Sequence, residues 1–296
     1  MLRAVLRVKP INHTVKRIGR LLMSPDAFAR FDRKMPLVDP FEITLPNNQR
    51  IQFEPFGDIC SKFLNFDGWN GYETGSVELF YALAQHADVT FDVGAYLGYF
   101  GLLAAAAHPG ARAYSFEAVP QLGRLARRIA KANPHLNIEV IDAAVSDRNG
   151  SITLYLAADP FSSDTSTAAG HRPDRTPVTV PAITLDDFVK QRQIERVDLL
   201  KIDTETTEPA VLAGFSETIA RCRPTFLCEV LPTADVSLLS EFCRKHDYSF
   251  AWIRDRSLMA VQAITADTTL CNLNYLFYPR NVNTPMTDEI HRRLEC

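Results

Sequence analysis

Three carboxylates follow a hydrophobic run near the middle of the chain. In VDLLKIDTETTEPAVLAGF, residues 197–215, the run ends at Asp203, and Glu205 and Glu208 come soon after it. If the extended backbone persists, Asp203 and Glu205 point to the same side of the strand. Two close carboxylates raise the pKa of one of the pair, which makes it a better acceptor for the proton of an alcohol. The spacing therefore predicts that Asp203 and Glu205 act at a reacting centre, either by orienting a hydroxyl or by accepting its proton.

Glu208 has a different expected role. It precedes Pro209 and stands where a helix begins, with Thr206 or Thr207 as the cap, so we expect a helix-terminus acid. Three carboxylates could also bind magnesium or calcium. No Asn or His lies nearby in the sequence to complete such a site, and we therefore predict no metal.

A glycine-containing turn lies earlier in the chain, in VTFDVGAYLGYFGLL. A strand ends at Asp92, and Gly94 and Gly98 allow positive φ and a close approach of the backbone to a ligand. The next strand ends at Glu117, 19 residues after Gly98, where an acid can accept hydrogen bonds from ribose hydroxyls. Tyr96 stands where GxGxxG would place a second glycine. The pattern predicts a nucleoside-type ligand but disfavours a dinucleotide.

The acid before the turn helps to identify that ligand. Asp92 would repel a pyrophosphate but suits the ammonium group of an amino-acid-bearing nucleoside, which favours S-adenosylmethionine over NAD. A nicotinamide oxidoreductase is accordingly disfavoured. The third strand ends at Asp142, which could accept a hydrogen bond from an adenine amino group while Ala143 leaves room for the ring. An ordinary turn acid is the alternative for Asp142.

Strand-like and helix-like segments alternate around these residues. Near-continuous apolar strands separated by amphipathic helices predict an α/β fold, with a parallel sheet covered on both faces. We expect strands at 89–93, 111–117, 137–143, 151–157, 197–203, 225–231, 248–254 and 272–279, and helices at 75–87, 99–108, 120–133, 184–193, 208–220 and 235–246.

One connection lacks any apolar periodicity. Residues 158–177 are rich in Ser, Thr, Asp and Pro, and a segment of this length is expected to be a lid or disordered. His171 within it would be a better base than a carboxylate at neutral pH, although a surface histidine is the expected reading.

The composition of the 296-residue chain limits the partners. The formal net charge is -3, so nucleic acid is disfavoured. The six cysteines show no metal-ligand spacing and are expected to be reduced thiols of a cytoplasmic protein, and no stretch resembles a transmembrane segment or signal peptide. Residues 1–23 carry six bases and no acid, and could contact an anionic membrane. We instead expect a helical extension packed on the domain, followed by a β-hairpin at 41–54.

The motifs, taken together and in order, resemble the FkbM family of S-adenosylmethionine-dependent methyltransferases. The resemblance rests on FDVGAYLGYF, SFEAVP, IDAAVSDRNGSITLYL, VPAITLDDF, LLKIDTETTEPAVLAGF and RPTFLCEV, over roughly residues 72–231. It implies a class I methyltransferase fold, with a seven-stranded, mostly parallel sheet whose last strand is inserted antiparallel and with helices on both faces. It also implies a methyltransferase domain at 71–296, preceded by an N-terminal extension at 1–70 that we expect to cap the substrate crevice.

The same resemblance implies an activity and its residues. Members of the family mostly methylate hydroxyl oxygens, so the expected acceptor is a hydroxyl of a glycan, sugar or small natural product. Thr206 stands where the family usually has Gly, which leaves a non-catalytic binding or scaffold module as the alternative. The implied cofactor-binding residues are Glu73, Asp92, Gly94, Ala95, Tyr96, Gly98, Glu117, Ala118, Asp142 and Ala143.

Overall fold

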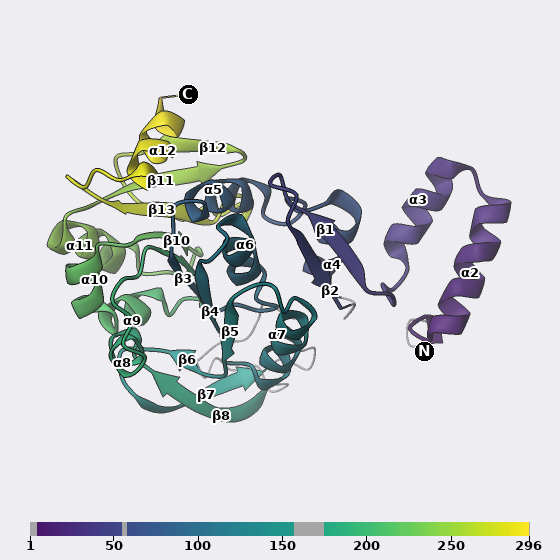
Figure 1. Cartoon of the computed structure of the whole chain (residues 1–296), viewed down its shortest axis with the longest axis horizontal. Coiled ribbons are helices and arrows are strands. Elements are labelled where there is room, and N and C mark those ends of the chain that lie inside the picture. Colours follow the sequence, from purple (N-terminus) through teal and green to yellow (C-terminus); the bar gives the residue numbers. More distant parts are fainter. Residues whose placement is uncertain (1–4, 55–57, 157–174, 296) are drawn as a thin grey trace. The chain divides into compact units, whose positions relative to one another are not determined.

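A computed structural model of the chain describes residues 5–54, 58–156 and 175–295 (Figure 1). The chain divides into two compact units, Met1–Glu73 and Thr74–Cys296. His171 and most of the 158–177 segment lie outside the described residues. The end of that segment is described, and it already belongs to a strand that begins at Thr176.

The N-terminal unit contains helices and a hairpin. Its elements are α2 (Lys9–Leu22), α3 (Pro25–Lys34), β1 (Phe41–Thr44), β2 (Arg50–Phe53) and α4 (Ile59–Asp67). Pro10 lies in the first turn of α2, where its missing N–H breaks no helical hydrogen bond, so the helix that begins at Lys9 accommodates this proline. Gly19 of α2 faces the rings of Phe28 and Phe31 on α3. The predicted hairpin is present, with Ile43 opposite Ile51.

The central sheet of the second unit has the strand order β12-β11-β13-β10-β9-β3-β4-β5 (Figure 1). Strands β5, β4, β3, β9 and β10 are parallel, whereas β13 is antiparallel to both β10 and β11. This is the class I methyltransferase fold that we predicted, with β12 as an eighth strand at one edge. The bounds are β3 (Val89–Val93), β4 (Arg112–Phe116), β5 (Ile138–Ile141), β9 (Leu199–Ile202), β10 (Thr225–Glu229), β11 (Tyr248–Arg254), β12 (Ser257–Ala260) and β13 (Asn274–Pro279).

Helices connect and cover these strands. Helix α6 packs on β3 and β4 and on α5, whereas α8 to α11 contribute to a core cluster with β3, β4, β9 and β10. The helix predicted at 208–220 is instead two helices that meet at Gly214, where a Cβ would lie 2.1 Å from the carbonyl oxygen of Ser146. The bounds are α5 (Thr74–Ala84), α6 (Tyr99–Ala107), α7 (Pro120–Ala132), α8 (Leu185–Gln191), α9 (Glu208–Ala213), α10 (Ser216–Cys222), α11 (Val236–His246) and α12 (Pro285–Leu294).

A second, smaller sheet contains β6 (Ala144–Val145), β7 (Gly150–Leu156) and β8 (Thr176–Ile183) in the order β6-β8-β7. The strand predicted at 151–157 therefore lies outside the central sheet. It pairs antiparallel with β8, and the two cover a small apolar cluster that includes Val119, Leu154 and Val180. Tyr96 and Ala118, two of the predicted cofactor residues, pack partly buried against this cluster.

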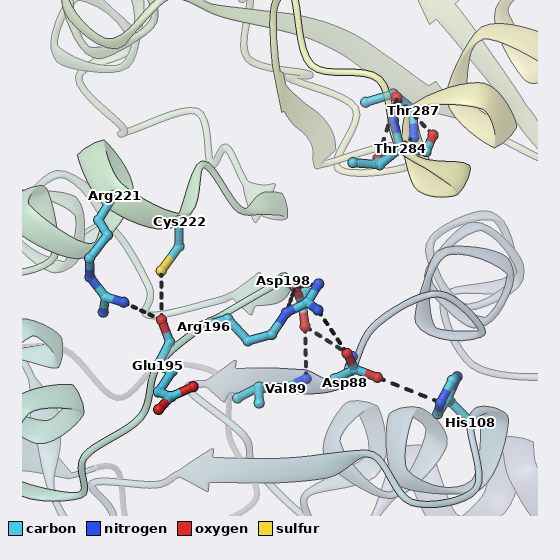
Figure 2. Close-up of polar contacts among 10 residues, drawn as sticks. All are labelled: Asp88, Val89, His108, Glu195, Arg196, Asp198, Arg221, Cys222, Thr284 and Thr287. Carbon is cyan, nitrogen blue, oxygen red and sulfur yellow. Dashed lines mark hydrogen bonds and ion pairs between the residues drawn. The ribbon is translucent and has the colours of Figure 1, made fainter.

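Ion pairs and hydrogen bonds hold the amino ends of β3 and β9 together (Figure 2). Asp198 Oδ2 accepts hydrogen bonds of 2.9 Å from the backbone N–H groups of Asp88 and Val89. Arg196 contacts both carboxylates, 2.8 Å from Asp198 and 2.9 Å from Asp88. These contacts fix the register of β3 and β9, and with it the relation between their carboxyl ends.

Candidate active site

The turn after β3 brings its backbone against the end of β9. Gly94 and Gly98 have φ of 78° and 76°, and Gly98 is the N-cap of α6. A Cβ on Gly94 would lie 1.7 Å from the carbonyl oxygen of Asp203, so only glycine fits at this position. Asp203 N also donates to Val93 O at 2.9 Å. The predicted cofactor turn and the predicted catalytic acid are thus direct neighbours.

Glu117 closes the other side of the turn. Its carboxylate accepts hydrogen bonds of 2.7 Å from the backbone N–H groups of Tyr96 and Val119. Burial raises the pKa of Glu117 to about 7, although these hydrogen bonds act in the opposite direction. The bond from its backbone N–H holds Tyr96 at φ 53°, and the carboxylate keeps lone-pair capacity to accept a further hydrogen bond.

Asp92 lies beneath the turn. Its carboxylate accepts hydrogen bonds from Gly101 N at 2.9 Å and from the Ser115 hydroxyl at 3.4 Å, and the residue is 1% exposed. Burial raises its pKa to about 7. These contacts place Asp92 as a support for the first turn of α6, and its contact with a ligand ammonium stays a prediction.

Asp142 and Ala143 follow β5. The Asp142 carboxylate is exposed and pairs with Arg127 of α7, while Ala143 is buried. A Cβ on Gly123 of α7 would lie 2.4 Å from Asp142 Oδ1 and 3.8 Å from Glu117 O, so this helix brings the ends of β4 and β5 together. Glu73 has φ 43° and is the last residue of the N-terminal unit, and its role as a cofactor contact stays a prediction.

A carboxylate cluster lies at the carboxyl ends of β9 and β10. One oxygen each from Asp203, Glu205 and Glu229 lie within 4.8 Å of one another. Burial raises the pKa of Glu229 to about 10, and the neighbouring Asp203 adds to the rise. Glu229 therefore keeps its proton at neutral pH. Grouped carboxylates of this kind can take up a proton or a divalent cation.

Lys201 supplies positive charge to this cluster. Its side chain is 1% exposed, and its Nζ lies 2.7 Å from Asp203 Oδ2 and 3.1 Å from Asn274 Oδ1. The ammonium also lies 5.3 Å from the centre of the Phe100 ring. A buried ammonium needs such partners because desolvation costs several kcal/mol. The contacts fix the Asp203 carboxylate beside the turn.

Sequence reasoning missed Lys201, Glu229 and Asn274. They lie on β9, β10 and β13, which are adjacent in the sheet but far apart in the chain. A signal was present for Lys201 and Glu229, because a charged residue inside an apolar run such as LLKID or FLCEVL is expected to be buried and to need a partner.

The turn that carries Glu205 is held by Glu208. Glu208 is buried, and its Oε1 accepts hydrogen bonds of 3.1 Å from Thr204 N and Thr206 N. Thr207 is the N-cap of α9, one of the two predicted positions, but its side chain makes no cap hydrogen bond. Glu205 and Thr206 have φ of 55° and 84°. Thr206 thus adopts the left-handed conformation that favours glycine, at a strain typical of functional turns.

Known proteins share sequence similarity with this chain. Residues 92–250 match the family described as "Methyltransferase FkbM domain". The chain is 31% identical over 202 residues to "31-O-demethyl-FK506 methyltransferase FkbM" of Streptomyces tacrolimicus, covering 59% of this chain and 75% of that protein.

Two solved structures are also similar. Methyltransferase FkbM from Methylobacillus flagellatus KT is 15% identical, with a TM-score of 0.44 over 73% of this chain, and the chain spans about half of that protein (52%). The O-methyltransferase from Bacillus cereus in complex with SAH is 14% identical, with a TM-score of 0.40 over 70% of this chain and 80% of that one.

Proposed function

This chain belongs to the FkbM methyltransferase family, and from that membership we propose that it transfers a methyl group from S-adenosylmethionine to a hydroxyl oxygen of a sugar or small natural product. The name of the Streptomyces tacrolimicus relative describes methylation at an oxygen of a natural product, which supports this class of acceptor. The observation that carries the proposal is the cluster of Asp203, Glu205 and Glu229 beside the Gly94 turn.

The residues around the turn fit S-adenosylmethionine. Glu117 offers free lone pairs at the end of β4, where ribose hydroxyls can donate to them. Asp142 offers an acceptor for an amino group at the end of β5, next to the small side chain of Ala143. When bound, the cofactor supplies a methyl group already activated by the sulfonium charge.

The protein's contribution is to orient the acceptor and receive its proton. An alcohol has a high pKa, so its oxygen becomes a better nucleophile if a carboxylate accepts the proton as the new bond forms. Asp203 is fixed by Lys201 at 2.7 Å, and Glu205 lies in the adjoining turn, so both can hold a hydroxyl in line. Glu229 holds its own proton and is therefore a hydrogen-bond donor in the cluster.

Transfer of a labelled methyl group to a panel of sugars and hydroxylated natural products tests the proposal. We expect methyl ether products with the wild-type protein, and a large loss of rate in Asp203→Asn and Glu205→Gln variants that still bind S-adenosylhomocysteine. Glu241→Gln, an exposed acid on α11, is the matched control. Binding without turnover on any acceptor would instead favour the non-catalytic binding module, and methylation of nitrogen or carbon would exclude the proposed acceptor class.

A further inference from the structure

Helix α2 carries an apolar stripe on the surface of the N-terminal unit. The stripe contains Ile11, Val15, Ile18 and Leu22, whose spacing of three and four residues places them on one side of the helix. Ile18 is 50% exposed and Leu22 is 79% exposed, and Leu21 beside them is 78% exposed. A row of exposed large aliphatic side chains on one helix indicates a binding surface.

Another side of α2 is used for packing within the unit. Asn12 Nδ2 donates to Pro36 O at 3.0 Å, and Gly19 lies against the rings of α3. Lys16 Nζ lies 2.7 Å from Asp32 Oδ1. Figure 1 shows α2 and α3 as neighbouring antiparallel helices, and these contacts account for their pairing. The residues of the stripe are therefore different from those that pack α2 within the unit.

The charge of this helix pair is opposite to that of the rest of the chain. Residues 5–35 contain eight Lys or Arg and two Asp, whereas residues 36–296 contain 23 Lys or Arg and 33 Asp or Glu. Arg17 and Arg20 are exposed along α2 itself, and Arg7 is exposed just before the helix begins. A basic helix with an exposed apolar row combines the two properties that bind an anionic membrane surface, which are apolar burial and attraction to acidic headgroups.

We propose that the stripe docks on an anionic lipid bilayer, with α2 lying in the plane of the headgroups. No helix among the described residues is long and apolar enough to span a membrane. A second copy of the chain is disfavoured as the occupant, because two helix pairs of strong positive charge would repel each other. This inference does not depend on the methyl acceptor.

Vesicle flotation of the full-length protein tests the proposal. We expect the chain to float with vesicles that contain phosphatidylglycerol but not with vesicles of phosphatidylcholine alone, and to be released by salt. Leu22→Asp and Ile18→Asp should each lower the bound fraction at least about tenfold, because each removes an inserted aliphatic side chain. Leu238→Asp, at a 46% exposed position on α11, is the matched control and should float as the wild type does.

Three results would overturn the proposal. The first is absence of flotation by the folded wild-type protein. The second is equal flotation of Leu22→Asp, Ile18→Asp and the wild type. The third is a dimer in solution that Ile18→Asp converts to a monomer, since this would assign the stripe to a second copy. Circular dichroism of each variant separates loss of binding from loss of folding.

Discussion

Replacing Glu229 by Gln should change how the stability of the protein depends on pH. The carboxyl of Glu229 has a pKa raised from an ordinary 4.5 to about 10, with burial as the largest cause and Asp203 as the next. Between these two values the folded chain holds a proton on Glu229 that the unfolded chain has lost. Stability contributed by this group is therefore complete below pH 4.5 and decreases as the pH rises towards 10.

The size of the effect follows from the linkage relation. Each pH unit between the two pKa values changes the free energy of unfolding by about 1.4 kcal/mol, so the group costs the wild type about 3 kcal/mol between pH 6 and pH 8. Because Glu229 is not completely buried, we expect the free energy of unfolding to fall by about 2 kcal/mol between these pH values. Gln is neutral at both values and lacks this dependence. Asp92 and Glu117 titrate in both proteins and cancel in the comparison.

Urea unfolding at pH 6 and pH 8 measures this difference directly. The wild type should lose about 2 kcal/mol more than Glu229→Gln between the two pH values. Glu241→Gln, at an exposed position on α11, should follow the wild type. Parallel pH dependence of the wild type and Glu229→Gln would refute the assignment of a protonated carboxyl at the end of β10.

Three further substitutions test the surroundings of the site by urea or thermal unfolding. Gly94→Ala should destabilise the fold by about 3 kcal/mol or more, because its Cβ would lie 1.7 Å from Asp203 O at φ 78°, and a loss below about 1 kcal/mol would contradict that packing. Lys201→Met should lower the free energy of unfolding by about 3 to 5 kcal/mol at pH 7, because it leaves Asp203 without its counter-charge. The control Lys190→Met, at an exposed position, should change it little. Equal effects of the two substitutions would argue against the buried pair. Thr206→Gly should stabilise the protein by up to about 1 kcal/mol, because glycine adopts a φ of 84° without strain. Thr207→Gly should destabilise it, because Thr207 has an ordinary φ of -103°. The opposite order of stability would rule out strain at Thr206.

Local sequence patterns were sufficient for much of the central sheet. The segments at 89–93 and 248–254 are strands with the predicted bounds, because apolar runs bounded by turn residues specify them locally. Gly94 and Gly98 have the positive φ that the turn pattern indicated. Strand β13, inserted antiparallel between β10 and β11, followed from the family resemblance, because sequence order does not determine which strands become neighbours.

Features that depend on contacts between distant segments were not predicted. The strand at 151–157 alternates like any half-buried strand, and only its pairing with β8 places it in the smaller sheet. Asn274 and Glu229 lie far from Lys201 in the sequence and meet it only through strand pairing. The hydrogen bonds that Asp92 accepts from Gly101 and Ser115 were also not predicted, because both donors lie on segments that follow its strand. The role of the N-terminal residues as a substrate cap stays a prediction.

Calorimetric titration with S-adenosylhomocysteine tests the central claim, that the turn after β3 and the end of β4 hold the cofactor. We predict saturable binding of one equivalent by the wild type, and binding by Glu205→Gln of similar strength. Glu117→Ala should lose binding while circular dichroism shows a folded protein. Absence of binding by the folded wild-type chain, or unchanged binding by Glu117→Ala, would contradict the assignment of this turn as the cofactor site.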